Sequence, residues 1–120
     1  MNTKFNVGNK VKWFDPNIEE ITEENIDYLN QVWVVTNVSI GKDYVGKDDE
    51  RIDFVFYTIS NGEQAERAFE CELVPADIEI SLTTDGDVEL YGNESTCDDA
   101  FDWIVRMTSA NIYINDKLAN

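Results

Sequence analysis

The residues of this chain that could do chemistry are mainly carboxylates. It has 25 Asp and Glu against 9 Lys and Arg, no histidine and two cysteines, for a formal net charge of −16. Without histidine, no Ser/His/Asp or Cys/His catalytic arrangement can form, and Cys71 or Cys97 would lack the base that usually activates a thiol. No glycine-rich phosphate-binding loop is present. We therefore expect a protein that is not an enzyme and that uses no cofactor.

The residue types also disfavour a metal site. Zinc is held mainly by cysteine and histidine, and this chain has two of the first and none of the second. Asp85, Asp87 and Glu89 offer oxygen atoms of the kind that calcium prefers, but their spacing lacks the glycine and terminal glutamate of an EF-hand loop. A hairpin turn explains Asp85-Gly86-Asp87 better, so no metal site is expected.

The carboxylates of the second half follow a pattern. Residues 77–83 and 87–91 alternate polar and apolar, which predicts a two-stranded ribbon with its acids on one face. Acids two apart along a strand lie about 6.6–6.8 Å from each other, in the range of adjacent phosphates on a nucleic-acid strand. A predicted helix adds more acids and a tryptophan. The candidate partner-binding residues are Asp77, Glu79, Asp87, Glu89, Tyr91, Asp98, Asp99, Asp102 and Trp103.

Two interpretations of these residues are open. The acids can serve solubility alone, and Trp103 can simply cover the rim of the core. Alternatively, Trp103 beside carboxylates is an anchor in an interface, because aromatic residues dominate binding energy. The partner would then be a basic surface of another protein. Direct binding of nucleic acid is not expected, because phosphate contacts need a basic footprint, and anionic membranes are disfavoured for the same reason.

These observations support two hypotheses for function. The first is a non-enzymatic acidic protein-binding module, in its sharper form a nucleic-acid mimic that inhibits a DNA- or RNA-binding enzyme. Small acidic phage antirestriction, anti-CRISPR and uracil-glycosylase inhibitors are similar in style. The second is an adaptor or structural module of a mobile element or bacterial operon that binds a peptide or partner subunit. In that case the acidity serves solubility only.

In the first half, the pattern predicts an opening strand in Val7–Pro16, where Lys10–Trp13 alternates after a turn at Gly8-Asn9. An inserted amphipathic helix is expected over about 18–30, with Thr22 as a plausible N-cap. Strands are expected at 31–40, 52–60 and 64–69, with a polar loop at 41–51 and a helical turn at 70–73. Trp13 and Trp33 are expected in the core.

Asn61-Gly62 predicts a two-residue hairpin turn between two of these strands. That turn would place Thr58 opposite Ala65 and Phe54 opposite Phe69. The opening Val7-Gly8, the strand ending in Trp13, the five-strand meander and the exit at Phe69–Pro75 resemble the SH3-like small barrels. The resemblance covers about residues 5–76 and implies a fold, with no specific family and no functional residues.

Residues 77–120 are expected to form an acidic ββαβ unit, either separate from the barrel unit of residues 1–76 or packed on it as one domain. A three-residue loop, Thr84–Gly86, would pair Leu82 with Val88 and Ile80 with Leu90, because glycine suits its last position. A helix is expected from about 96 to 108, capped by Ser95 or Thr96, then a strand at 111–115 and a frayed tail. The predicted fold class is α+β, mostly β: an SH3-like five-strand barrel with a helical insertion, followed by a ββαβ unit.

The predicted compartment is the cytoplasm. The N-terminal residues lack the apolar segment of a signal peptide, and no apolar run is long enough to span a membrane. Cys71 and Cys97 are then expected as two buried free thiols, with a disulfide between the two halves as the alternative. The sequence predicts no oligomeric state.

Overall fold

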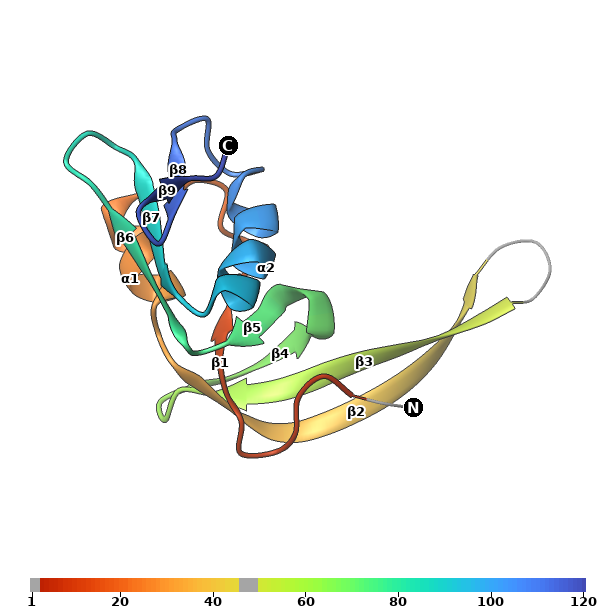
Figure 1. Cartoon of the computed structure of the whole chain (residues 1–120). Helices are drawn as coiled ribbons and strands as arrows, with labels where there is room; N and C mark the ends of the chain where they lie inside the picture. The colour runs from red at the N-terminus through yellow and green to blue at the C-terminus, as the bar shows by residue number, and fades with distance from the viewer. Residues whose placement is uncertain (1–2, 46–49) are drawn as a thin grey trace.

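A computed structural model describes residues 3–45 and 50–120, and the side chains of all of these except 42–45 and 50–53. The described residues form an α+β structure that is mostly β, with two sheets and two α-helices (Figure 1). The predicted fold class is confirmed at this level.

The first sheet contains five antiparallel strands in the order β4-β3-β2-β1-β5. A single 3-10 turn, η1 (Glu70–Glu72), joins β4 to β5 and confirms the predicted helical turn. In the described part of the chain, β4 and β5 remain the two edges of this sheet, so it is not a closed barrel. The strands are β1 (Lys10–Trp13), β2 (Trp33–Val45), β3 (Glu50–Ser60), β4 (Ala65–Phe69) and β5 (Leu73–Pro75).

The predicted polar loop at 41–51 is wrong. β2 continues to Val45 and β3 starts at Glu50, with Val45 paired to Glu50. Together they form a two-stranded arm that projects from the rest of the molecule (Figure 1). A ribbon that no other element covers needs no apolar side chains to form, so polarity alone did not distinguish this strand from a loop. Residues 46–49 of the predicted loop lie outside the described residues.

The predicted register of the β3–β4 hairpin is also wrong. Ser60 pairs with Ala65 and Phe56 with Phe69, so the loop has four residues, Asn61–Gln64. The Asn61 carboxamide oxygen accepts from the backbone N–H of Glu63 and of Gln64, both at 2.9 Å. This side chain replaces the tight turn with a wider one, and Gly62 alone of the Asn-Gly pair has a positive φ, at +96°.

Helix α1 (Glu23–Leu29) is shorter than the predicted helix at 18–30. Thr22 is confirmed as its N-cap, because its hydroxyl accepts from the Asn25 N–H at 3.2 Å. The preceding residues stay outside the helix because Asp15 and Pro16 start a turn, in which the Ile18 N–H donates to the Asp15 carbonyl at 3.0 Å. Ile18 and Ile21 nevertheless pack against the core.

The second sheet follows β6 (Ile78–Leu82), β7 (Val88–Gly92), β8 (Ile112–Ile114) and β9 (Lys117–Leu118) in that order. Leu82 pairs with Val88 and Ile80 with Leu90, which confirms the three-residue loop. Gly86, at the last loop position, has a φ of +88°, a conformation that glycine adopts without steric cost.

Helix α2 (Glu94–Ile104) joins β7 to the parallel strand β8. The predicted span of 96–108 with a cap at Ser95 or Thr96 is wrong. Asn93 is the N-cap and accepts from the Thr96 N–H at 3.1 Å, whereas Thr96 itself is buried. Asparagine and threonine are both good caps, and the start of the apolar arc at Cys97 favoured the later one.

The predicted frayed tail is wrong as well. Asn115 and Asp116, at φ +48° and +70°, turn the chain so that β9 pairs with β8. The Asn120 carboxamide then accepts from the Ile112 N–H at 2.9 Å and donates to the Ala110 carbonyl at 3.0 Å. Side-chain hydrogen bonds, which hydrophobic periodicity does not report, hold the tail in place.

Two hydrophobic cores hold the described elements together. One lies within the five-stranded sheet and contains Trp13 and Trp33, as predicted. The other lies between the second sheet and both helices, and it also includes Phe14 and Val74 of the first sheet region. Both cysteines are free thiols: Cys97 is buried, but Cys71 is exposed, so the expectation of a buried thiol at position 71 is wrong.

Candidate functional site: two acidic surfaces

The second sheet has one covered and one open face. Ile78, Ile80 and Leu90 share a core with Cys97, Ala100 and Ile104 of α2 and with Ile26 and Leu29 of α1. Because side chains alternate along a strand, Glu79, Glu89 and Tyr91 lie on the face of the ribbon opposite to this core. Glu79 also borders a groove between β6 and α1. The predicted acidic face of the ribbon is therefore open.

We call Asp77, Glu79, Asp87, Glu89 and Tyr91 the outer ribbon face. Asp77 directly precedes β6 and Asp87 directly precedes β7, and the other three lie within these strands. Register places Glu79 opposite Tyr91 and Ser81 opposite Glu89, with Tyr113 of β8 beside Glu89. In the part of the chain that the structure describes, the sole ion pair joins Lys4 to Asp99, at 3.6 Å. The four carboxylates of this face thus have no cation at ion-pair distance among the described residues.

Tyr91 lies between two carboxylates on this face. Its hydroxyl lies 2.9 Å from Glu89 Oε2 and 3.0 Å from Asp116 Oδ1, so two acceptors share one proton. The hydrogen bonds to Glu89 and Asp116 raise the pKa of Tyr91 to about 12. Sequence reasoning missed Asp116, because it treated the tail as frayed and not as the turn before β9.

The helix face consists of Asp98, Asp99, Asp102 and Trp103. It lies on α2, which covers the inner side of the second sheet, so it faces away from the outer ribbon face. Trp103 is partly buried against the core. Its ring stacks on Phe14, with centroids 4.8 Å apart and planes at 28°.

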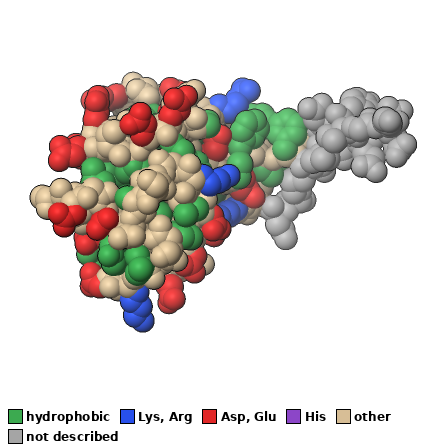
Figure 2. Space-filling view, turned by 90° about the horizontal axis from the view of Figure 1, so that it is seen from above, with side chains coloured by type: hydrophobic (Ala, Val, Ile, Leu, Met, Phe, Trp, Pro, Cys, Tyr) green, Lys and Arg blue, Asp and Glu red, His purple; other side chains and the backbone are tan. Residues whose placement is uncertain are grey.

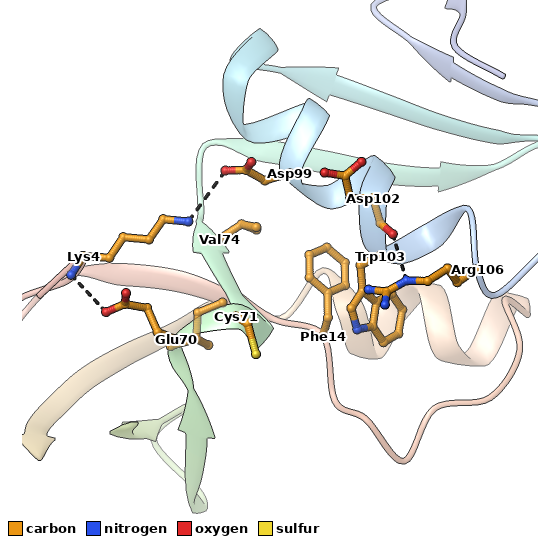
Figure 3. Close-up of a pocket in the computed structure, with 10 residues that line it drawn as sticks. Lys4, Phe14, Glu70, Cys71, Val74, Asp99, Asp102, Trp103 and Arg106 are labelled. Carbon is orange, nitrogen blue, oxygen red and sulfur yellow. Dashed lines mark hydrogen bonds and ion pairs between the residues drawn. The ribbon is translucent and has the colours of Figure 1, made fainter. Parts of the chain in front are cut away.

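A cleft of about 210 Å³ lies where the helix face meets the first sheet (Figure 3). The Lys4 ammonium approaches Asp99 across this cleft, and the Lys4 backbone N–H donates to Glu70 Oε2 at 3.1 Å. Arg106 Nε donates to the Asp102 backbone carbonyl at 3.0 Å. Arg106 therefore bonds the backbone of Asp102 and forms no ion pair with its carboxylate. The cleft is lined by Lys4, Phe14, Glu70, Cys71, Leu73, Val74, Asp99, Asp102, Trp103 and Arg106.

The nine predicted residues therefore occupy two surfaces on opposite sides of the second sheet. The structure adds Lys4, Glu70 and Cys71 beside the helix face, which sequence reasoning missed because they are far away along the chain. No local pattern pointed to them. In the view of Figure 2, acidic side chains are spread over the surface, with hydrophobic and uncharged side chains between them.

The described residues offer little nucleophilic or metal-binding chemistry. Burial, followed by the charges of Asp98, Asp77 and Glu94, raises the pKa of the Cys97 thiol, which disfavours the reactive thiolate. Among residues 3–45 and 50–120, no three side chains of the metal-binding types are grouped closely enough to hold an ion. Neither described helix has the length and apolar character needed to cross a membrane.

Comparison with protein-family models, with curated proteins and with solved structures finds no match to this chain.

Proposed function

We propose that this protein is a non-enzymatic protein-binding module whose acidic surfaces bind a basic surface of another protein. The observation that carries this proposal is the outer ribbon face. Two of its four carboxylates, Glu79 and Glu89, lie on the paired strands β6 and β7, and the other two directly precede these strands. None of the four has a cation at ion-pair distance among the described residues. Carboxylates in this state attract a basic partner over long range, and salt screens that attraction.

A sharper form of the proposal is a nucleic-acid mimic that occupies the binding channel of a DNA- or RNA-binding enzyme. In an extended strand, residues two apart along the chain lie about 6.6–6.8 Å apart. The outer ribbon face supports the mimic, because it has two pairs of acids with this separation along the chain, the second acid of each pair in a strand and the first directly before it. Such a mimic would use this face alone, since the helix face points the other way. An inhibitor of this kind would suit a phage or another mobile element acting in the cytoplasm.

We further propose that residues 5–76 are an opened form of the SH3-like fold. The strand order β4-β3-β2-β1-β5 and the single 3-10 turn before β5 support this assignment. The fold itself specifies no partner.

Affinity capture from a lysate, followed by mass spectrometry at low and at moderate salt, tests the proposed function. The ribbon variant carries Asp77→Asn, Glu79→Gln, Asp87→Asn and Glu89→Gln. A control variant carries Glu19→Gln, Glu20→Gln, Glu63→Gln and Glu66→Gln, four exposed acids elsewhere that change the net charge by the same amount.

We expect the wild type and the control to retain a basic protein at low salt and the ribbon variant to lose it. Equal retention by all three proteins would contradict a role for the outer ribbon face. If the retained protein is a nucleic-acid enzyme, competition with its DNA or RNA distinguishes mimicry from binding elsewhere.

A further inference from the structure

One face of the first sheet differs from the rest of this acidic protein. Register aligns its side chains in rows across the strands, because directly paired residues share a face. The odd-numbered residues Tyr57 and Ile59 of β3 point into the core, so their neighbours point outward. The rows of this outer sheet face are Lys10–Val34–Ser60–Ala65, Asn37–Thr58–Arg67, Ser39–Phe56–Phe69 and Gly41–Phe54.

Three phenylalanines form a cluster on the outer sheet face. The Phe54 ring centroid lies 5.7 Å from that of Phe56 and 6.2 Å from that of Phe69, which is 48% exposed. The Phe54 ring lies across Gly41, where an added Cβ would be 2.5 Å from its tip. Figure 2 shows exposed hydrophobic side chains where the described part of the arm meets the grey atoms.

The charged side chains on this face are basic, whereas the net charge of the protein is negative. The Arg67 guanidinium carbon lies 4.7 Å from the Phe56 ring centroid, and Lys10 is at the far corner. No Asp or Glu occurs in the four rows. A basic partner of the kind proposed above therefore finds no carboxylate to pair with on this face. A partner with a carboxylate can pair with Arg67.

The edge of β4 offers backbone groups beside this face. The Asn61 N–H donates to the Gln64 carbonyl at 3.2 Å. In an antiparallel pair every second residue bonds the neighbouring strand, so after Gln64 the residues of β4 that bond β3 are Glu66 and Ala68. Ala65, Arg67 and Phe69 then point their N–H and C=O groups away from β3. Glu72 Oε1 accepts from the Phe69 N–H at 3.1 Å. Ala65 and Arg67 thus present the backbone groups that an added strand requires.

We propose that the β4 edge and the outer sheet face bind an extended peptide strand of another protein. This strand pairs with the backbone of Ala65 and Arg67. Side chains two apart on it share one face, so one apolar side chain packs on Phe69 and Phe56, and one carboxylate pairs with Arg67. This site is separate from the acidic surfaces and has the opposite charge preference.

The test uses two short soluble peptides that alternate Thr and Val around a central residue, which is Glu in one and Lys in the other. Binding is measured by titration of the amide NMR spectrum at about 0.15 M salt, where the Debye length of about 8 Å screens the net charge of the protein. We expect the Glu peptide to bind about fivefold more tightly than the Lys peptide, as for a strong exposed ion pair. The amides of Ala65 and Arg67 should shift most.

The charge swap Arg67→Glu should make the Lys peptide bind more tightly than the Glu peptide. Phe69→Ser should weaken the binding of both peptides. The far-UV circular dichroism of both variants should equal that of the wild type. The ribbon variant should bind both peptides as the wild type does, which separates this site from the proposed acidic interface. Equal binding of the two peptides, binding of neither, or an unchanged preference in Arg67→Glu would overturn the proposal. Concentration-dependent dimerisation lost in Phe69→Ser would instead assign the face to a second copy of this chain.

Discussion

The carboxamide of Asn30 gives Ile80 both hydrogen bonds that a neighbouring strand would give. The Ile80 N–H donates to Asn30 Oδ1 at 2.9 Å, and Asn30 Nδ2 donates to the Ile80 carbonyl at 2.5 Å. Ile80 belongs to β6, the edge strand of the second sheet. The Lys12 ammonium donates to the Asn30 carbonyl at 2.9 Å, so one residue connects β1, α1 and β6.

We expect Asn30→Ala to destabilise the protein by about 2–3 kcal/mol, because it leaves the partly buried N–H and C=O of Ile80 without partners. The matched control is Asn25→Ala, which removes an exposed carboxamide that donates to the Glu20 carbonyl. It should cost less than about 1 kcal/mol. Urea unfolding measures both values. An Asn30→Ala variant no less stable than Asn25→Ala would show that this linkage is unimportant.

Lys12 should make stability depend on alkaline pH. Burial lowers the pKa of its ammonium below 10.5, and the opposing charge of Glu79 is the smaller effect. Between the folded pKa and 10.5, the unfolded chain binds the proton and the folded chain does not, so this group favours folding more as the pH rises. The wild type should therefore gain stability relative to Lys12→Met between pH 7 and about 10. Urea unfolding at both pH values measures this gain, and a constant difference would argue against a buried ammonium.

Tyr91 should ionise late. Hydrogen bonds to Glu89 and Asp116 raise the pKa of Tyr91 from 10 to about 12. The stabilisation that these hydrogen bonds give to the folded state is therefore fully present below pH 10 and is lost as the pH rises through about 12. The ultraviolet absorbance of tyrosinate measures this titration. Tyr91→Phe should remove one late-titrating group, and Asp116→Asn should move that group to lower pH. A wild-type tyrosine titration that is complete well below pH 12 would contradict this arrangement.

Gly92 should tolerate no side chain. Its φ is +133°, and an added Cβ would lie on the Asp77 carbonyl and 2.9 Å from the Ile78 Cα, neither of which can move freely. We expect Gly92→Ala to cost well over about 3 kcal/mol. Gly86 is the control, because its φ is +88° but the space around it is open; Gly86→Ala should cost only about 1 kcal/mol. Thermal unfolding distinguishes the two, and equal costs would mean that strain alone governs both sites.

The elements that the sequence predicted correctly are those whose residues act locally. The register of β6 and β7 followed from alternating apolar residues and one glycine at the right loop position. The Thr22 cap and the buried Trp13 and Trp33 likewise follow from residue type and spacing. In each case the physical cause lies within a few residues of the feature.

Several of the errors have one common cause, which is hydrogen bonding of side chains to the backbone. Asn61, Asn93, Asn115 and Asn120 each use a side-chain amide to bond backbone, and these bonds set the hairpin loop, the start of α2, the last turn and the tail. Apolar periodicity carries no information on such bonds. The candidate partner-binding residues stay a prediction. The structure divides them between two sides of the second sheet, and no sequence pattern reports on which side of a sheet a helix packs.

If the outer ribbon face binds a basic partner through its charge, the affinity of the captured partner must depend on salt concentration. The affinity of the wild type should fall steeply as salt rises, and the ribbon variant should bind more weakly with a clearly shallower dependence, because four carboxylates no longer contribute. The control variant with four distant glutamines should keep the wild-type slope. A wild-type affinity that does not change with salt, or a ribbon variant with the same salt dependence as the wild type, would contradict binding through the charge of this face.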